Sequence, residues 1–170
     1  MPGRDGGLGK KAEEKIQQWL DKPENGYSFD RIPDQMTGRF GSKNICDFVC
    51  FKCPEMYYIE SKATWDDRFD FNMLTETQHD GLLDKSKIQH VHAFVIVLFA
   101  SYKRAFVIDI RDIKRMEDSG KKSINIHKID SAQIPISCKE IATIPNNRKT
   151  YLDYSGDIAD YIPEYKGGLL

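Results

Sequence analysis

Two carboxylates and an amine converge on one face of a predicted β-hairpin. Residues 45–51 and 56–63 form its two extended runs, and a four-residue turn that contains a proline joins them. If the hairpin is symmetric about that turn, Asp47 on the first run lies directly opposite Glu60 on the second. Side chains alternate between the two faces of a strand, so Lys62 points the same way as both carboxylates.

These three groups have the chemistry of a metal-dependent phosphodiesterase. Two carboxylates a few ångströms apart repel each other, and a divalent cation between them relieves that repulsion. Ligands that are all oxygen favour Mg²⁺ or Mn²⁺. The alternative is a solvated cross-strand pair of Asp47 and Glu60 with Lys62 as a surface counter-ion, and the hairpin alone favours neither interpretation.

The Glu-x-Lys spacing is not specific by itself. It occurs three times, in Glu13-Glu14-Lys15, Glu60-Ser61-Lys62 and Glu164-Tyr165-Lys166. The first copy lies in a helical pattern, and the last lies in a segment with Pro and Gly, where a period of two cannot be assumed. The strand context therefore selects the middle copy.

The length and composition predict one soluble domain over residues 1–170. A chain of 170 residues is long enough to bury a core. Its longest apolar run, Ala93 to Ala100, is far shorter than the ~20 residues that cross a bilayer, and the start of the chain lacks the apolar stretch of a signal peptide. We therefore expect a cytoplasmic protein with no membrane partner.

The overall charge argues against nucleic-acid binding, whereas its distribution does not. The net charge is −1 and the pI is near 6.4. Residues 151–170 form an acidic C-terminal tail, so the rest of the chain is slightly basic, and local basic patches matter more to binding than the sum. These patches are Lys10-Lys11, Arg31 with Arg39 and Lys43, Lys103-Arg104, Lys121-Lys122 and Arg148-Lys149.

Three of the four cysteines lie in or beside the hairpin. No second pair or histidine follows Cys50 and Cys53 at the spacing of a zinc site. We expect Cys46 and Cys50 to be buried thiols that act as small apolar groups and share the strand face opposite Asp47.

A helix is expected near the start of the chain, after a flexible arm of residues 1–8. It ends between Leu20 and Lys22, because Pro23 follows. Glu13 and Glu14 then lie in or near its first turn, where a carboxylate complements the helix dipole. The apolar stripe of this helix consists of Ala12, Ile16, Trp19 and Leu20.

The remaining pattern predicts a mixed α/β sheet flanked by helices. We expect a mostly antiparallel meander in which one helix crosses back over the sheet. The strand at 92–100 is apolar and β-branched throughout, which is typical of a strand covered on both faces. The expected elements are strands at 27–32, 92–100, 105–110 and 123–129, a polar loop at 33–44, and helices at 75–88 and 112–118.

In this order the motifs resemble the RecU-type Holliday junction resolvases, within the nuclease superfamily of the Asp, Asp/Glu-x-Lys signature. Gly9 followed by Glu13-Glu14 matches the start of those proteins, and their Glu-x-Lys-x-Thr motif corresponds to Glu60, Lys62 and Thr64. The resemblance spans roughly residues 9–130. Its further parts are Phe71, the Gln78 that initiates a helix, Phe94-Val95-Ile96 and Gly120-Lys121-Lys122-Ser123-Ile124.

Two departures from the family pattern are visible, and a phage-type or otherwise compact member would fit them. Cys46 precedes Asp47 where RecU proteins usually have a hydroxyl residue. The loop at 33–44 is short beside the region from which RecU proteins project a stalk into the junction.

The resemblance implies a restriction-endonuclease-like fold and an endodeoxyribonuclease that acts on four-way junctions in DNA recombination and repair. Its cofactor would be Mg²⁺, with Mn²⁺ as a substitute. Asp47, Glu60 and the carbonyl of Ser61 would bind the metal, and Glu13 or Glu14 would approach from the first helix. Lys62 would position the attacking water, and Gln78 would orient Lys62 or contact the DNA backbone.

The expected DNA contacts come from the polar loop and the end of the second hairpin strand. Loops commonly carry phosphate-binding groups. The candidates are Arg31, Arg39, Ser42, Lys43, Asn44 and Thr64. Family resemblance also implies a homodimer, because a junction has two equivalent strands to cut, and a possible recombinase or branch-migration partner.

Two other functions stay open. One is a nuclease of the same fold that cuts duplex, flapped or other branched DNA. The other is a non-catalytic module of this fold that binds DNA or regulates a recombinase.

Overall fold

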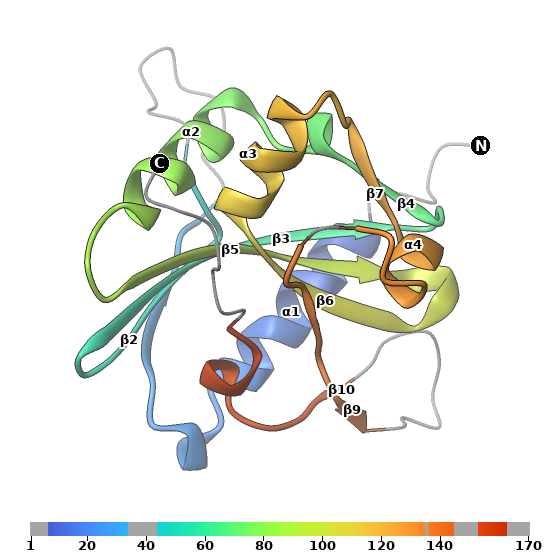
Figure 1. Ribbon diagram of the computed structural model, residues 1–170. Coiled ribbons are helices and arrows are strands. Elements are labelled where there is room, and N and C mark those ends of the chain that lie inside the picture. Colours follow the sequence, from blue (N-terminus) through green and yellow to red (C-terminus); the bar gives the residue numbers. More distant parts are fainter. Residues whose placement is uncertain (1–6, 34–43, 135, 145–152, 163–170) are drawn as a thin grey trace.

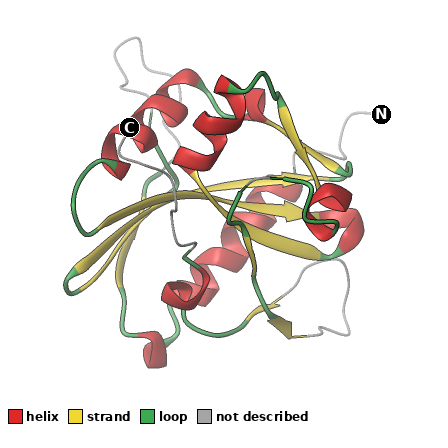
Figure 2. Ribbon diagram, viewed as in Figure 1, coloured by secondary structure: helices red, strands yellow, loops and turns green. Residues whose placement is uncertain are grey.

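A six-stranded sheet with the order β1-β2-β3-β5-β6-β8 forms the centre of the computed structural model, which describes residues 7–33, 44–134, 136–144 and 153–162 (Figure 1). Helix α1 (Leu8–Leu20) covers one face, and α2 (Glu76–Ser86) with α3 (Ile110–Asp118) covers the other (Figure 2). The expected α/β class, a mixed sheet flanked by helices, is confirmed. The strands are β1 (Ser28–Arg31), β2 (Phe48–Lys52), β3 (Glu55–Thr64), β5 (Val91–Phe99), β6 (Arg104–Asp109) and β8 (Lys139–Glu140).

The hairpin of β2 and β3 has the predicted register. Lys52 lies opposite Glu55, and Phe48 lies opposite Ile59. The ladder ends at the pair of Phe48 and Ile59, and Asp47 is the residue directly before Phe48 in the sequence. The N–H of Asp47 donates to the Ile59 carbonyl at 3.0 Å. Asp47 therefore leaves the strand instead of pairing directly opposite Glu60.

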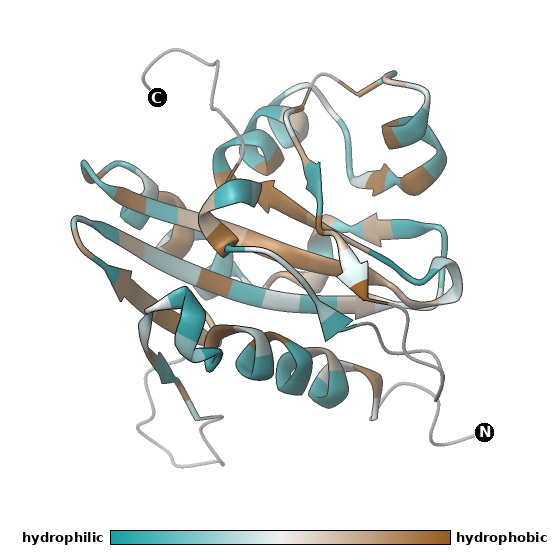
Figure 3. Ribbon diagram, turned by 90° about the horizontal axis from the view of Figure 1, so that it is seen from below, coloured by the Kyte–Doolittle hydropathy of each residue, from teal (hydrophilic) through white to brown (hydrophobic). Residues whose placement is uncertain are grey.

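Strand β5 joins the two halves of the sheet and is buried on both faces, as expected. It pairs in parallel with β3, because α2 carries the chain back to the starting edge, and antiparallel with β6. Phe94, Ile96 and Leu98 face the core beneath α1, whereas the alternating residues Val95 and Val97 face α2 and α3. Figure 3 shows the hydrophobic colouring of these central strands.

The first helix begins earlier than its sequence suggested. It starts at Leu8, which is buried, so the Gly-rich arm is shorter than expected. Glu13 and Glu14 consequently lie in the second turn, and the first turn has no acidic residue. The predicted dipole role for these carboxylates is therefore wrong.

Three expectations about the second half of the chain need correction. Segment 123–129 is a short strand, β7 (Ser123–Asn125), followed by a helix, α4 (Ile126–Asp130). Strand β7 pairs with β4 (Arg68–Asp70), a strand that the sequence pattern did not reveal. The acidic tail also contributes to the core, because Tyr154 of β10 (Asp153–Tyr154) and Ile158 are buried beneath α1.

The two cysteines of the hairpin lie in different cores. Cys50 packs with α1, and Cys46 packs on the opposite side with α2 and α3. They do not share a face, because Cys46 precedes the regular strand. Both thiols are buried, as expected, and burial raises the pKa of each to about 12.

None of the described helices combines the length and apolar character needed to cross a membrane.

Gly81 of helix α2 packs closely against Ile45, which lies two residues before Asp47. A Cβ at this position would lie 2.3 Å from Cγ2 and 2.7 Å from Cβ of Ile45. We predict that Gly81→Ala lowers the free energy of unfolding by about 1 kcal/mol or more, because overpacking costs about 1–3 kcal/mol and exceeds the gain in helix propensity. Gly9→Ala in α1 is the matched control, since a Cβ there meets nothing within 4 Å. Urea unfolding measures both, and equal stability of the two variants would contradict the prediction.

Candidate active site

Hydrogen bonds from both its backbone and its carboxylate hold Asp47 at the end of the hairpin. Its N–H donates to the Ile59 carbonyl at 3.0 Å, and its carbonyl accepts the Ile32 N–H at 2.8 Å. Its Oδ2 accepts the Ser61 N–H at 2.8 Å. Because both the backbone and the carboxylate are bonded to neighbouring strands, the position of this acidic group is determined by the sheet.

Glu60 is almost completely buried, with 1% of its surface exposed. Its Oε1 lies 2.8 Å from the Lys62 ammonium and accepts a hydrogen bond of 2.7 Å from Nε2 of Gln78. Its Oε2 is buried without a hydrogen-bond donor among the described residues. One carboxylate oxygen is therefore satisfied by the protein, and the other still lacks a partner.

The pKa of Glu60 is raised from 4.5 to about 8. Burial is the largest cause, and repulsion from the Asp47 carboxylate is the next. Lys62 lowers this pKa through its charge and its hydrogen bond, and Glu13 raises it further. Lys62 therefore offsets only part of the free-energy cost of burying a charged carboxylate beside Asp47.

Gln78 belongs to the site in a way that the sequence did not predict. It is the third residue of α2, and it completes a capping box with Thr75. Its Oε1 accepts the Thr75 N–H at 3.0 Å while its Nε2 donates to Glu60. It therefore orients Glu60 rather than Lys62 and ties the start of α2 to the acidic pair.

The first helix brings one of its two carboxylates to this region. Glu13 lies close enough to Glu60 to raise its pKa, and its Oε2 is 2.5 Å from a guanidinium nitrogen of Arg31. Glu14 is the next residue on the helix and is exposed to solvent. The geometry thus favours Glu13 over Glu14. It also gives Arg31, an expected DNA contact, an ion-pair role.

The other expected DNA contacts are placed only in part. Arg39, Ser42 and Lys43 lie outside the described residues. Asn44 donates from Nδ2 to the Pro33 carbonyl at 2.8 Å. Thr64 is buried, and its Oγ1 accepts the Asp66 N–H at 3.0 Å.

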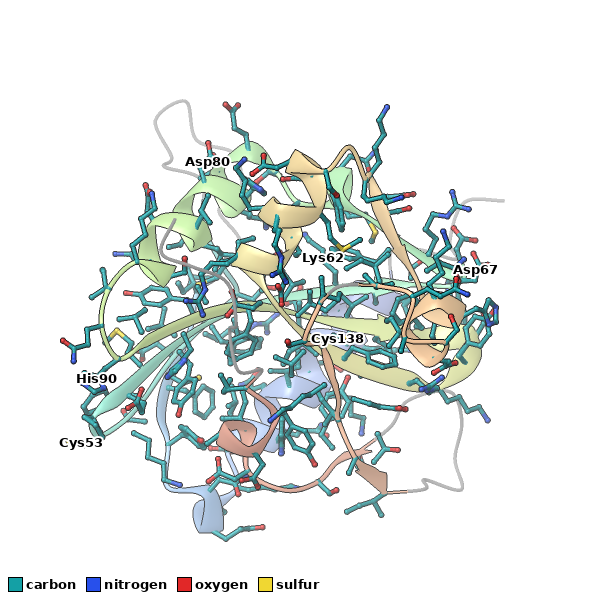
Figure 4. All side chains as sticks on the ribbon, viewed as in Figure 1. Cys53, Lys62, Asp67, Asp80, His90 and Cys138 are labelled. Atoms are coloured by element: carbon teal, nitrogen blue, oxygen red, sulfur yellow. The ribbon has the colours of Figure 1, made fainter. Side chains whose placement is uncertain are left out.

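A cavity of about 950 Å³ begins where β3 passes beyond the end of β2. Ala63 and Thr64, which follow Lys62 directly, line it together with Arg68 and Met73. In Figure 4, Lys62 lies near the centre of the sheet and Asp67 at the end of the molecule formed by β4 and β7. The cavity therefore connects the region after the candidate catalytic lysine to β4.

The family is established by comparison with known sequences. The model of the RecU family, described as recombination protein U, matches residues 23–156. The chain belongs to the RecU family. The resemblance to the RecU-type Holliday junction resolvases is thereby confirmed, and so is the expectation of an endodeoxyribonuclease at the level of the family.

Two further comparisons accompany the family match. Among solved structures, the chain is similar to Hjc, a Holliday junction resolvase from Archaeoglobus fulgidus, with 17% identity and a TM-score of 0.49 over 69% of this chain and 88% of that chain. A search of curated proteins finds no match.

The donor set of this RecU-family site fits a hard divalent cation. Two carboxylates lie together, and the unpartnered Oε2 of Glu60 is an oxygen ligand without a proton donor. Among the described residues, no group of three or more His, Cys, Asp or Glu side chains is arranged to hold a metal. Further ligands would therefore be backbone oxygens, water or substrate, which is typical of Mg²⁺.

We predict that the stability of the metal-free RecU-family chain falls as the pH rises from about 4.5 to about 8, the interval between the ordinary and the folded pKa of Glu60. In that interval the folded protein holds a proton that the unfolded chain has released, so the free energy of unfolding falls by up to about 1.4 kcal/mol per pH unit. This contribution is complete below the lower value and lost above the higher one.

Glu60→Gln should remove that dependence, because an amide is neutral throughout. Urea titrations in EDTA at several pH values measure the effect in both proteins. If the wild type and Glu60→Gln show parallel pH profiles, Glu60 does not carry the shifted proton.

The two roles of Gln78 can be separated by substitution. Gln78→Glu keeps an acceptor for the Thr75 N–H, so the start of α2 should survive, but it replaces the donor to Glu60 with a third carboxylate. We predict near-normal thermal stability with DNA cleavage reduced about a hundredfold or more, since orientation of a reacting group is worth at least that. Thr75→Ala is the matched control, because it weakens the cap and leaves the Gln78 amide in place. Equal loss of activity in both variants would show that capping alone matters.

Proposed function

We propose that this protein is a Mg²⁺-dependent endonuclease that hydrolyses phosphodiesters in four-way DNA junctions. The observation that carries the proposal is the convergence of Asp47, Glu60 and Lys62 at the point where β3 passes beyond β2. Membership in the RecU family supports the substrate.

Asp47 and Glu60 would hold the metal, with the Ser61 carbonyl and water completing the shell. When bound, Mg²⁺ would lower the pKa of an attacking water and neutralise charge that builds up on the phosphate. Binding requires Glu60 to lose the proton that burial favours, and the cation supplies the opposing charge.

The chain's own groups would position the substrate and the water. The Lys62 ammonium, 2.8 Å from Glu60 Oε1, is a compact charge that can orient the water and offset the phosphate. Gln78 would keep the Glu60 carboxylate in one orientation, and Glu13 would approach from α1 to hold a water molecule. Glu14 and the loop residues Arg39, Ser42 and Lys43 have no defined role in this scheme.

A homodimer is part of the proposal. Two symmetric sites would cut the two equivalent strands of a junction, and a two-fold axis is the simplest way to arrange them. The proposed binding partners of this homodimer are branched DNA and, by family resemblance, a possible recombinase or branch-migration protein.

Cleavage of a labelled synthetic four-way junction with Mg²⁺ tests this proposal. We predict that Asp47→Asn, Glu60→Gln and Lys62→Ala each reduce cleavage about a thousandfold, because the first two would weaken the hold on the metal ion and the third removes the ammonium that would offset the phosphate charge. Lys87→Ala serves as the matched control: Lys87 is an exposed lysine at the end of α2, paired only with Asp84 at 3.0 Å. Calorimetry should show Mg²⁺ binding to the wild type and weakened binding to Asp47→Asn.

Parallel substrates separate the alternatives. Equal cutting of linear duplex or flapped DNA would replace the junction resolvase with a general nuclease of the same fold. DNA binding without cleavage, unchanged by all three substitutions, would favour a non-catalytic module.

A further inference from the structure

The β4–β7 ribbon, formed by Arg68–Asp70 and Ser123–Asn125, presents one polar face. Phe69 lies opposite Ile124, and both are completely buried in the core beneath α2 and α3. Residues on either side of this pair point the other way, so Arg68 with its partner Asn125, and Asp70 with its partner Ser123, lie on the outer face. The buried aromatic and aliphatic pair thus fixes the face from which the Arg68 side chain extends.

A cavity of about 250 Å³ lies against this ribbon and is lined by three cationic residues. Arg68 comes from β4, Lys121 from the turn after α3, and Lys128 from α4. Ser123 and Asn125 also line it, and the Asn125 side chain donates to Asp67 at 3.0 Å and accepts the His127 N–H at 2.9 Å. None of the described residues that line the cavity is acidic. Two segments that are far apart in sequence, β4 and residues 121–128, therefore bring positive charge to one small cavity.

These three cations lack counter-ions within the part of the chain that the structure describes. Arg68, Lys121 and Lys128 form no ion pair or side-chain hydrogen bond with another described residue. By contrast, Arg104 and Arg111 each form an ion pair with a carboxylate. All three are exposed to solvent. Like charges held close together without a partner favour an anion, and Arg with Lys suits a phosphate.

Arg68 also connects this cavity to the candidate active site. It lines the cavity of about 950 Å³ that Ala63 and Thr64 share, directly after Lys62 on β3. Asp66 and Asp70 line that larger cavity as well, whereas the charged residues described in the lining of the smaller cavity are all cationic. A strand that leaves Lys62 past Thr64 would reach Arg68 and then the two lysines.

We propose that the β4–β7 ribbon, together with Lys121 and Lys128 beside it, binds backbone phosphates of the DNA strand that runs past Lys62, away from the point of cleavage. This inference rests on the proposed nuclease function, because it places the surface relative to Lys62. The ribbon contributes binding and direction to the strand and does not touch the reacting atoms. Phosphate contacts of this kind set register without reading sequence.

The test compares Arg68→Gln, Lys128→Gln and the double variant with Lys87→Gln, a matched loss of one exposed charge at the far end of α2. Affinity for a labelled four-way junction is measured in EDTA over a series of salt concentrations. Arg68→Gln and Lys128→Gln, called the ribbon variants together with the double variant, should each bind the junction about tenfold more weakly than Lys87→Gln. A tenfold loss is the scale of one hydrogen bond to a charged group. The slope of log affinity against log salt should fall by ~0.7–0.9 for each charge removed.

The same variants are then assayed for cleavage at saturating protein, where their rates should equal that of Lys87→Gln. Ribbon variants with wild-type affinity and salt slope would overturn the proposal while leaving the nuclease function intact. If the wild-type protein cuts no DNA and the ribbon variants still bind the junction more weakly, the DNA-binding role of the ribbon is supported and the nuclease function is refuted. If the variants bind DNA normally but lose affinity for polyglutamate, the surface binds an acidic protein segment, and the proposal fails.

Discussion

The site depends on how Asp47 is held where the β2–β3 ladder ends. Its N–H and carbonyl are bonded to Ile59 and Ile32, and its carboxylate accepts the Ser61 N–H. Two neighbouring strands therefore define this acidic group before any ligand arrives. The rest of the site is arranged around it: Glu60 lies beside it on β3, α2 brings Gln78, and α1 brings Glu13.

This arrangement stores electrostatic repulsion in the folded protein. A carboxyl group that is 1% exposed beside a second carboxylate favours its neutral form, and Lys62 opposes this only in part. Natural structures usually avoid such groups because burial of a charge is costly unless it is paired. In the proposed function this cost would become useful when a cation binds, since Oε2 of Glu60, which has no hydrogen-bond donor among the described residues, would then gain a partner. Stability and metal binding would be coupled through one proton.

Much of this was visible in the sequence, and the exceptions share a physical cause. Local patterns predicted α1, the hairpin register, α2 and the doubly covered strand β5, because each depends on the period of apolar residues within one segment. The sequence missed β4 and its pairing with β7, whose three-residue strands are too short to show a period and lie more than fifty positions apart. Lys121 and Lys122 were visible as a basic pair, but only the ribbon places Lys121 beside Arg68.

The candidate site also has a part that local sequence predicts and a part that it does not. Residue types and spacing predicted that Asp47, Glu60 and Lys62 lie together, because alternation along β3 decides which side chains share a face. Alternation does not extend past the last ladder pair, so the sequence misplaced Cys46 and put Asp47 directly opposite Glu60. It also could not show that Gln78 caps its helix and binds Glu60 with the same amide, because that contact depends on the path of α2 over the sheet. Gly81 of α2 packs closely against Ile45, two residues before Asp47, so this contact helps to place the helix beside the acidic pair.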